Sequence, residues 1–313
     1  MALNIHDEIR ANKRKSFFVI MLFFAFIGFL GAVFGIILGI YSTGVFTWTS
    51  IIFSVTMALI VALVYVLIFM KVGANMVLKA TGAVEASRKD YPYLYHTTEA
   101  LSLAAGMRTP PKCYVIDDKS LNAYATGLKP ENSYVVVTTG LLEKLNRQEI
   151  EGVLAHEISH IKNQDIRVML LAAGLVGATV LLADLMFRAF IFAPKGGNHK
   201  MDPKLMIPIF IFWILLVVLS PIVGELIRLA ISRRREYLAD ATGAKLTRYP
   251  EGLASALEKI KNDSNPVMQR ANKATAHLFI SNPFSKTKGA MSRLFSTHPP
   301  IDDRIRRLRG QRN

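Results

Sequence analysis

The chain has 313 residues, of which 51% are hydrophobic, and its formal net charge is +15. A chain this apolar, with a positive mean hydropathy, is unlike an ordinary soluble enzyme and is searched first for membrane spans. Lys and Arg flanking such spans on the cytoplasmic side account for the basic charge, and no pattern of basic and aromatic residues favours nucleic acid as a partner. The single cysteine, Cys113, excludes an intrachain disulfide.

The N-terminal part predicts a transmembrane hairpin. Residues 16–70 contain no charged side chain, which is enough for two spans of about 20 residues each. We expect spans near 17–40 and 50–70, which together form a hairpin over 17–70. Basic residues lie outside both of its ends and none lies in its connecting loop. The positive-inside rule therefore places a short N-terminus (1–16) and the following segment (71–167) in the cytoplasm.

A second hairpin is predicted over 168–230, with spans near 168–190 and 205–230. Three lysines between these spans oppose an external loop, whereas the run Arg233-Arg234-Arg235 favours a return to the cytoplasm. The sequence therefore leaves open whether this hairpin fully crosses the bilayer. The last segment, 231–313, is expected to be cytoplasmic and mainly helical.

A metal-binding pattern lies at His156-Glu157-Ile158-Ser159-His160. Residues four apart share one face of a helix, so His156 and His160 can bind one Zn²⁺ ion while Glu157 reaches a water molecule on the metal. The alternative is an ordinary helix with two surface histidines. The apolar residues around the pentad, among them Ile150, Leu154 and Ile161, place the histidines at the edge of a buried face, where a site is expected.

A catalytic zinc ion needs a third protein ligand and one open position. Glu236 is the candidate, and Asp240, four residues on, is expected to accept the outer N–H of a ligand histidine. Asp165 is rejected as a ligand, because five residues beyond His160 on a continuous helix it points away from the metal face. The pentad and Glu236 lie just outside the two ends of the second hairpin, so one zinc site can form from both.

At this point the chain resembles the HtpX family of membrane zinc endopeptidases, gluzincins related to the CaaX prenyl proteases. Four motifs carry the resemblance: HEISH at 156–160, EYLAD at 236–240, NAYATG at 122–127 and THPP at 297–300. It implies a mainly α integral membrane protein with four transmembrane helices in two hairpins, plus a cytoplasmic α+β zincin-like catalytic domain with a small sheet. It also implies a multi-pass protein of the cell (inner) membrane that degrades misfolded or damaged membrane proteins in stress response and quality control.

The expected mechanism uses one zinc ion per chain, held by His156, His160 and Glu236, with Glu157 as general base for a zinc-activated water molecule. By resemblance, His298 stabilises the oxyanion, although it could equally be a histidine in a Pro-rich turn, and Arg304 is the second candidate. The expected substrates are unfolded or membrane polypeptides that bind as an added strand.

The strand at 133–138 is expected to provide the edge for that added strand, and Asn122, from its place in the family motif, to bind the substrate backbone. An intramembrane protease is a rival interpretation, but the residues after His160 are too polar for a span. The other alternative is a non-catalytic membrane chaperone or scaffold with a zinc-stabilised domain, which would have no need of Glu157.

Overall fold

The computed structural model describes residues 5–43, 45, 47–175, 177–178, 210, 214, 233–263, 275, 278–281 and 299–310. The chain divides into two compact units. One comprises Phe17–Lys71 and Gly174–Ile227, and the other comprises Met1–Ser16, Val72–Ala173 and Arg228–Asn313. Most of the predicted second hairpin (168–230) lies outside the described residues, and so does His298.

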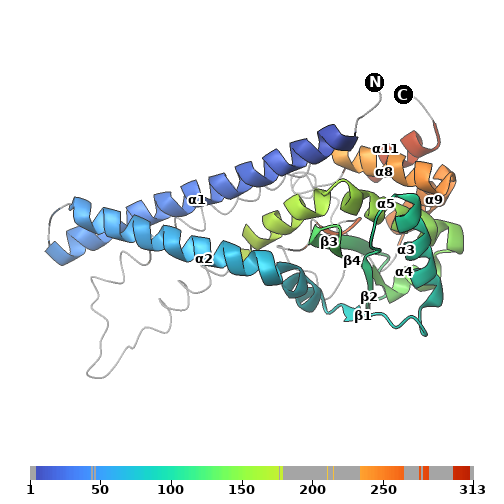
Figure 1. Ribbon diagram of the computed structural model, residues 1–313, viewed down its shortest axis with the longest axis horizontal. Coiled ribbons are helices and arrows are strands. Elements are labelled where there is room, and N and C mark those ends of the chain that lie inside the picture. The colour runs from blue at the N-terminus through green and yellow to red at the C-terminus, as the bar shows by residue number, and fades with distance from the viewer. Residues whose placement is uncertain are drawn as a thin grey trace. The chain divides into compact units, whose positions relative to one another are not determined.

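The first unit contains most of two long helices, α1 (Ile5–Thr43) and α2 (Trp48–Thr81) (Figure 1). Two stretches, Ser16–Ile36 and Trp48–Thr81, are long and apolar enough to cross a membrane. Large apolar side chains face outward from both helices; Phe17, for example, is 67% exposed and Trp48 69%. Such exposure would be costly in water and is expected in lipid. The second helix continues past its predicted end at residue 70.

A row of glycines on α1 sets how closely the two helices approach. A Cβ added at Gly31 would lie 3.0 Å from the Cβ of Ala58, and one at Gly35 would lie 2.6 Å from the Cα of Ile51. Glycines four residues apart lie on one helix face and let two backbones pack against each other without side chains between them. The hairpin is therefore held by close backbone contact.

The second unit contains a mixed four-stranded sheet in the order β1-β2-β4-β3. The outer strand β3 and the short β1 pair antiparallel with their neighbours, whereas β2 and β4 run parallel. The prediction that residues 133–138 form an exposed edge is wrong, because β4 lies between β2 and β3. Its β-branched run is buried on both faces, as is usual for an interior strand. The bounds are β1 Val84–Glu85, β2 Lys112–Ile116, β3 Ala123–Lys129 and β4 Asn132–Thr138.

Helix α5 (Arg147–Lys162) lies across this sheet at the centre of the unit (Figure 1). Twelve of its residues, from Glu149 onward, are buried, including Ile150, Val153, Leu154 and Ile158 in the core that it shares with the sheet. Around it lie α3 (Pro92–Ala104), α4 (Thr139–Lys144), α8 (Arg233–Thr247), α9 (Pro250–Lys261) and α11 (Ile301–Leu308), and a further helical stretch begins at residue 165. A helix buried on this scale is a rigid support for functional side chains.

Candidate metal centre

The start of α5 is fixed by a capping box. The side chain of Asn146 accepts the backbone N–H of Glu149 at 2.9 Å, and the Glu149 carboxylate accepts the backbone N–H of Asn146 at 2.7 Å. Glu149 also accepts hydrogen bonds from Ser255 at 2.8 Å and Lys259 at 2.7 Å on α9. The cap therefore fixes both the helix and its position against α9.

Two glycines let neighbouring helices approach α5 closely. Gly152 lies against α9, where an added Cβ would be 2.6 Å from the backbone nitrogen of Leu253. Gly243 of α8 lies against α5, where an added Cβ would be 3.1 Å from the backbone nitrogen of His156. This close contact brings α8, and with it Glu236, to the histidine face of α5.

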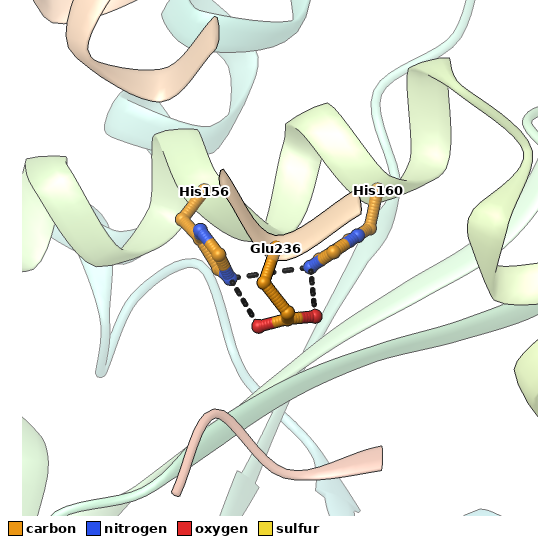
Figure 2. Close-up of side chains that lie close together, drawn as sticks. All are labelled: His156, His160 and Glu236. Atoms are coloured by element: carbon orange, nitrogen blue, oxygen red, sulfur yellow. Dashed lines mark hydrogen bonds and ion pairs between the residues drawn. The ribbon is translucent and has the colours of Figure 1, made fainter. Parts of the chain in front are cut away.

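His156, His160 and Glu236 converge in one buried cluster (Figure 2). The two Nε2 atoms are 3.2 Å apart. The Glu236 carboxylate lies 3.8 Å from Nε2 of His156 and 3.5 Å from Nε2 of His160. All three residues are almost fully buried, at 1%, 4% and 1% exposure, rather than at the partly sheltered edge that the sequence predicts. Glu236 thus joins the pentad histidines, as expected for a third ligand.

The outer nitrogen of each histidine faces a carboxylate. Nδ1 of His156 lies 2.9 Å from Asp240, which is the partner predicted from the sequence. Nδ1 of His160 lies 3.0 Å from Asp165, a contact that the sequence analysis missed. Since a carboxylate can only accept, each Nδ1 carries a proton, and in the neutral imidazole Nε2 then has the lone pair that a metal ligand needs.

Asp165 reaches His160 because the helix does not continue to it. Helix α5 ends at Lys162, Asn163 forms its C-cap, and Gln164 has a positive φ of 59°. This turn redirects the chain, so counting along a continuous helix placed Asp165 wrongly. The polar run Lys162-Asn163-Gln164 before it is the sequence signal for such an end, although the residue with positive φ is Gln164 and Asn163 has a helical φ of −80°.

The donor set fits a zinc ion. Zinc bound tetrahedrally at about 2.0–2.1 Å from two imidazole nitrogens holds those nitrogens about 3.3 Å apart, close to the 3.2 Å between the two Nε2 atoms. The lone pairs of two Nε2 atoms at that distance repel each other, and either a bound cation or a proton on His160 relieves this repulsion. Two histidines and one glutamate are also a ligand set that catalytic zinc sites use.

Arg304 of α11 is the fully buried cation beside this cluster. It donates from Nη2 and Nε to the two Asp240 oxygens at 2.7 Å and 2.9 Å. Nη2 also lies 3.4 Å from both ring nitrogens of His156, and Nη1 lies 3.7 Å from Glu236. Arg304 therefore fixes Asp240, and through it the orientation of His156.

Burial and these charges perturb the ionisable groups strongly. Burial and the nearby Glu236 together raise the pKa of Glu157 to about 7, against the opposite effects of His160, Arg304 and the Ala125 backbone. Burial also lowers the pKa of His156 to about 4, although the hydrogen bond to Asp240 opposes this. For His160, burial is outweighed by Asp165 and Glu236, which raise its pKa to about 9. The carboxylates around His160 therefore favour its protonated, positively charged form.

The remaining predicted residues are placed as follows. Asn122 immediately precedes β3 and its side-chain amide is hydrogen-bonded to both backbone groups of Ser281. Glu157 is 2% exposed and lies next to β3, where the backbone of Ala125 interacts with its carboxyl group. Arg304 lies at the site, and His298 is outside the described residues.

The sequence profile of peptidase family M48 matches residues 88–312 of the chain. A protease HtpX homolog of Dictyoglomus turgidum is 44% identical over 304 residues, which cover 97% of this chain and 94% of that protein. One of Streptococcus gordonii is 37% identical over 307 residues, covering 97% and 99%. Among solved structures, S. mikatae Ste24p matches 83% of this chain with 23% identity and a TM-score of 0.45, and the match spans 65% of that chain.

Proposed function

The chain belongs to peptidase family M48, and from this premise we propose that it is a zinc-dependent membrane endopeptidase. Its proposed substrates are misfolded or damaged membrane proteins, whose peptide bonds it hydrolyses at the cytoplasmic side. The observation that carries the proposal is the buried group of His156, His160 and Glu236. Glu157, on the same helix, adds the base that a purely structural zinc site would lack.

The proposed mechanism assigns each of these side chains a role. His156, His160 and Glu236 hold the zinc ion, which when bound supplies a Lewis acid for the scissile carbonyl and lowers the pKa of water. Glu157 accepts the proton of the attacking water and later donates it to the leaving amine. Its pKa of about 7 suits both directions of transfer near neutral pH. Asp165 and Asp240 keep both imidazoles in the tautomer that presents Nε2.

The developing oxyanion needs a donor besides the metal. His298 remains the proposed donor, by the family resemblance alone. Arg304 is less suited to this role, because two of its nitrogens already donate to Asp240. Its Nη1 nevertheless faces the cluster, 3.7 Å from Glu236.

We further propose that α1 and α2 span the cell membrane. Their length, apolar composition and outward-facing apolar side chains support this. Basic residues lie in the first part of α1 (Arg10 to Lys15) and from the end of α2 onward (Lys71, Lys79 and Arg88), outside the apolar stretch, and they favour a cytoplasmic location for the N-terminus and the catalytic unit.

The test is cleavage of β-casein by the detergent-purified protein and by Glu157→Gln, with zinc content measured on both. We expect cleavage by the wild type alone, a fall of about 10²- to 10⁴-fold in kcat/KM for the variant, and about one zinc ion in each. The matched control for ligand removal is a pair of histidine variants. His156→Ala is expected to lose zinc, whereas His96→Ala, at a histidine whose side chain is 63% exposed, is expected to keep it.

Other outcomes have definite meanings. Zinc in both proteins with cleavage by neither would favour the non-catalytic chaperone or scaffold. Equal cleavage by the wild type and Glu157→Gln would remove Glu157 from the mechanism.

A further inference from the structure

Residues 278–281, Leu-Phe-Ile-Ser, meet the outer edge of β3 through Ile280 and Ser281. Ile280 donates its backbone N–H to the carbonyl oxygen of Ala123 at 2.9 Å. Asn122 donates from Nδ2 to the carbonyl oxygen of Ser281 at 3.2 Å, and its Oδ1 accepts the backbone N–H of Ser281 at 3.4 Å. Since 280 faces 123 and 281 faces 122, Ile280 and Ser281 pass β3 in the antiparallel sense, although residue 278 lies in a short 3₁₀ turn and 279–281 are bent rather than extended.

This pairing takes place beside the metal cluster. The carbonyl oxygen of Ile280 lies 3.5 Å from Nη1 of Arg304, and the same guanidinium group lies 3.4 Å from the ring of His156. Farther along β3, the backbone of Ala125 interacts with the Glu157 carboxyl group. Within the described residues, the outer edge of β3 therefore lies next to the proposed catalytic base, Glu157.

An extended substrate would need the same groups. The outer strand of a sheet can form backbone hydrogen bonds with an added strand through its N–H and C=O groups. At this edge of β3, the Asn122 amide and the Arg304 guanidinium provide further hydrogen-bonding groups. The segment already uses the carbonyl of Ala123, both ends of the Asn122 amide and Arg304. A polypeptide cannot pair with this part of the edge while residues 278–281 occupy it.

We propose that residues 278–281 are an autoinhibitory segment that occupies the substrate-binding edge of β3, and that a substrate binds by displacing it. This rests on the proposed endopeptidase function and names its regulation. Displacement exposes apolar side chains, because Leu278, Phe279 and Ile280 are 3%, 0% and 2% exposed. The ring of Phe279 also packs edge-on against that of Tyr124, with centroids 4.9 Å apart. A polar peptide offers nothing to replace these contacts, so the site selects apolar extended segments, such as unfolded or membrane proteins expose.

The first test weakens the segment without touching the proposed catalytic residues. Ser281→Pro removes the N–H that Asn122 accepts, and Ser281→Ala keeps both backbone groups. Because apparent affinity scales with the fraction of binding-competent protein, we expect Ser281→Pro to raise kcat/KM for β-casein about 2- to 12-fold, the worth of one hydrogen bond, mainly through a lower KM. Ser281→Ala is expected to match the wild type, and zinc content and Tm check that both variants fold.

The second test does not depend on cleavage or on a folded proline variant. Hydrogen exchange is measured in full-length Glu157→Gln, with and without saturating β-casein. We expect the amides of Ile280 and Ser281 to be protected in the protein alone and to exchange faster with casein. Casein that binds while this protection stays unchanged would overturn the inference, as would wild-type kinetics in a correctly folded Ser281→Pro. Casein that opens the segment with no cleavage by the wild type would refute the proposed function and leave the occupancy of the edge established.

Discussion

Replacing Asp165 by asparagine tests how the site holds its metal. The Asp165 carboxylate is 1% exposed, lies 3.0 Å from Nδ1 of His160 and is 3.6 Å from Nε of Arg235. Asparagine has the same shape but no charge, so it weakens the hydrogen bond that makes His160 a strong donor. Loss of such a partner typically costs 10- to 100-fold in metal affinity, which corresponds to about 1.4–2.7 kcal/mol.

The effect should depend on pH in a direction that the structure defines. Burial lowers the pKa of His160, but Asp165 and the neighbouring carboxylates outweigh it and raise the value to about 9. In the wild type a proton therefore competes with zinc at about pH 7 and hardly competes above about pH 9. Asp165→Asn lowers that pKa and so relieves the competition. The ratio of the zinc Kd of the variant to that of the wild type should consequently be smaller at pH 7 than at pH 9.

The assay is chelator competition for zinc at both pH values, with kcat measured at saturating zinc. Asp302→Asn is the control, since that carboxylate is 63% exposed and pairs with Lys261 at the surface. If zinc binds Asp165→Asn within twofold of the wild type at both pH values, His160 needs no carboxylate partner and the reasoning is wrong.

Three further predictions concern the base, a helix contact and a helix cap. Because burial raises the pKa of Glu157 to about 7, kcat/KM should fall tenfold for each pH unit below that pKa, where the base is protonated. A bound zinc ion would lower the pKa of Glu157 and move this fall to lower pH. Gly243→Ala should push α8 away from His156 and lower both zinc affinity and activity, although Ala in a helix is usually favoured over Gly by about 1 kcal/mol. Asn146→Ala should lower the free energy of unfolding by about 0.5–2 kcal/mol through loss of the cap.

Each of these has a contrary outcome. A flat kcat/KM profile from about pH 5 to 8 would show that Glu157 is ionised throughout or is not the base. Gly243→Ala with unchanged zinc affinity would mean that α8 tolerates a small shift; Thr242→Ala on the same helix is the control. A loss of stability in Asn146→Ala no greater than in the exposed variant Glu143→Ala would contradict the role of the cap.

The sequence predicted the centre of the site because one rule of spacing governs it. The i, i+4 relation joined His156 to His160 and Glu236 to Asp240, and both pairs converge in the structure. The contact of Asp165 with His160 was not predicted, because the same rule was applied beyond Lys162, where the helix ends and Gln164 turns the chain. Periodicity predicts contacts within an element but not those made by the residue after it.

The edge of the sheet was misassigned for a related reason. The run Ser133 to Thr138 has the stronger strand composition, and a strand buried on both faces has that composition. The actual outer strand, β3, has the weaker sequence AYATGLK. Strand order depends on contacts between distant segments, and local preference does not specify it. The glycines of α1 can likewise be seen in the sequence, but the sequence does not show that α2 is the helix that packs against them.

The charges of the cluster connect the metal to the stability of the fold. Among the described residues, Glu157, Asp165, Glu236 and Asp240 bring four buried carboxyl groups, and Arg235 and Arg304 bring two buried guanidinium groups. With neutral histidines and ionised carboxylates, two negative charges remain, which a divalent cation would balance. Unbalanced buried charge is costly, and the raised pKa values of Glu157 and His160, about 7 and about 9, favour protonation that would reduce this imbalance. A divalent cation at the proposed site would balance the remaining charge, and burial, assisted by the neighbouring Glu236, would keep the pKa of the proposed base Glu157 near neutral pH.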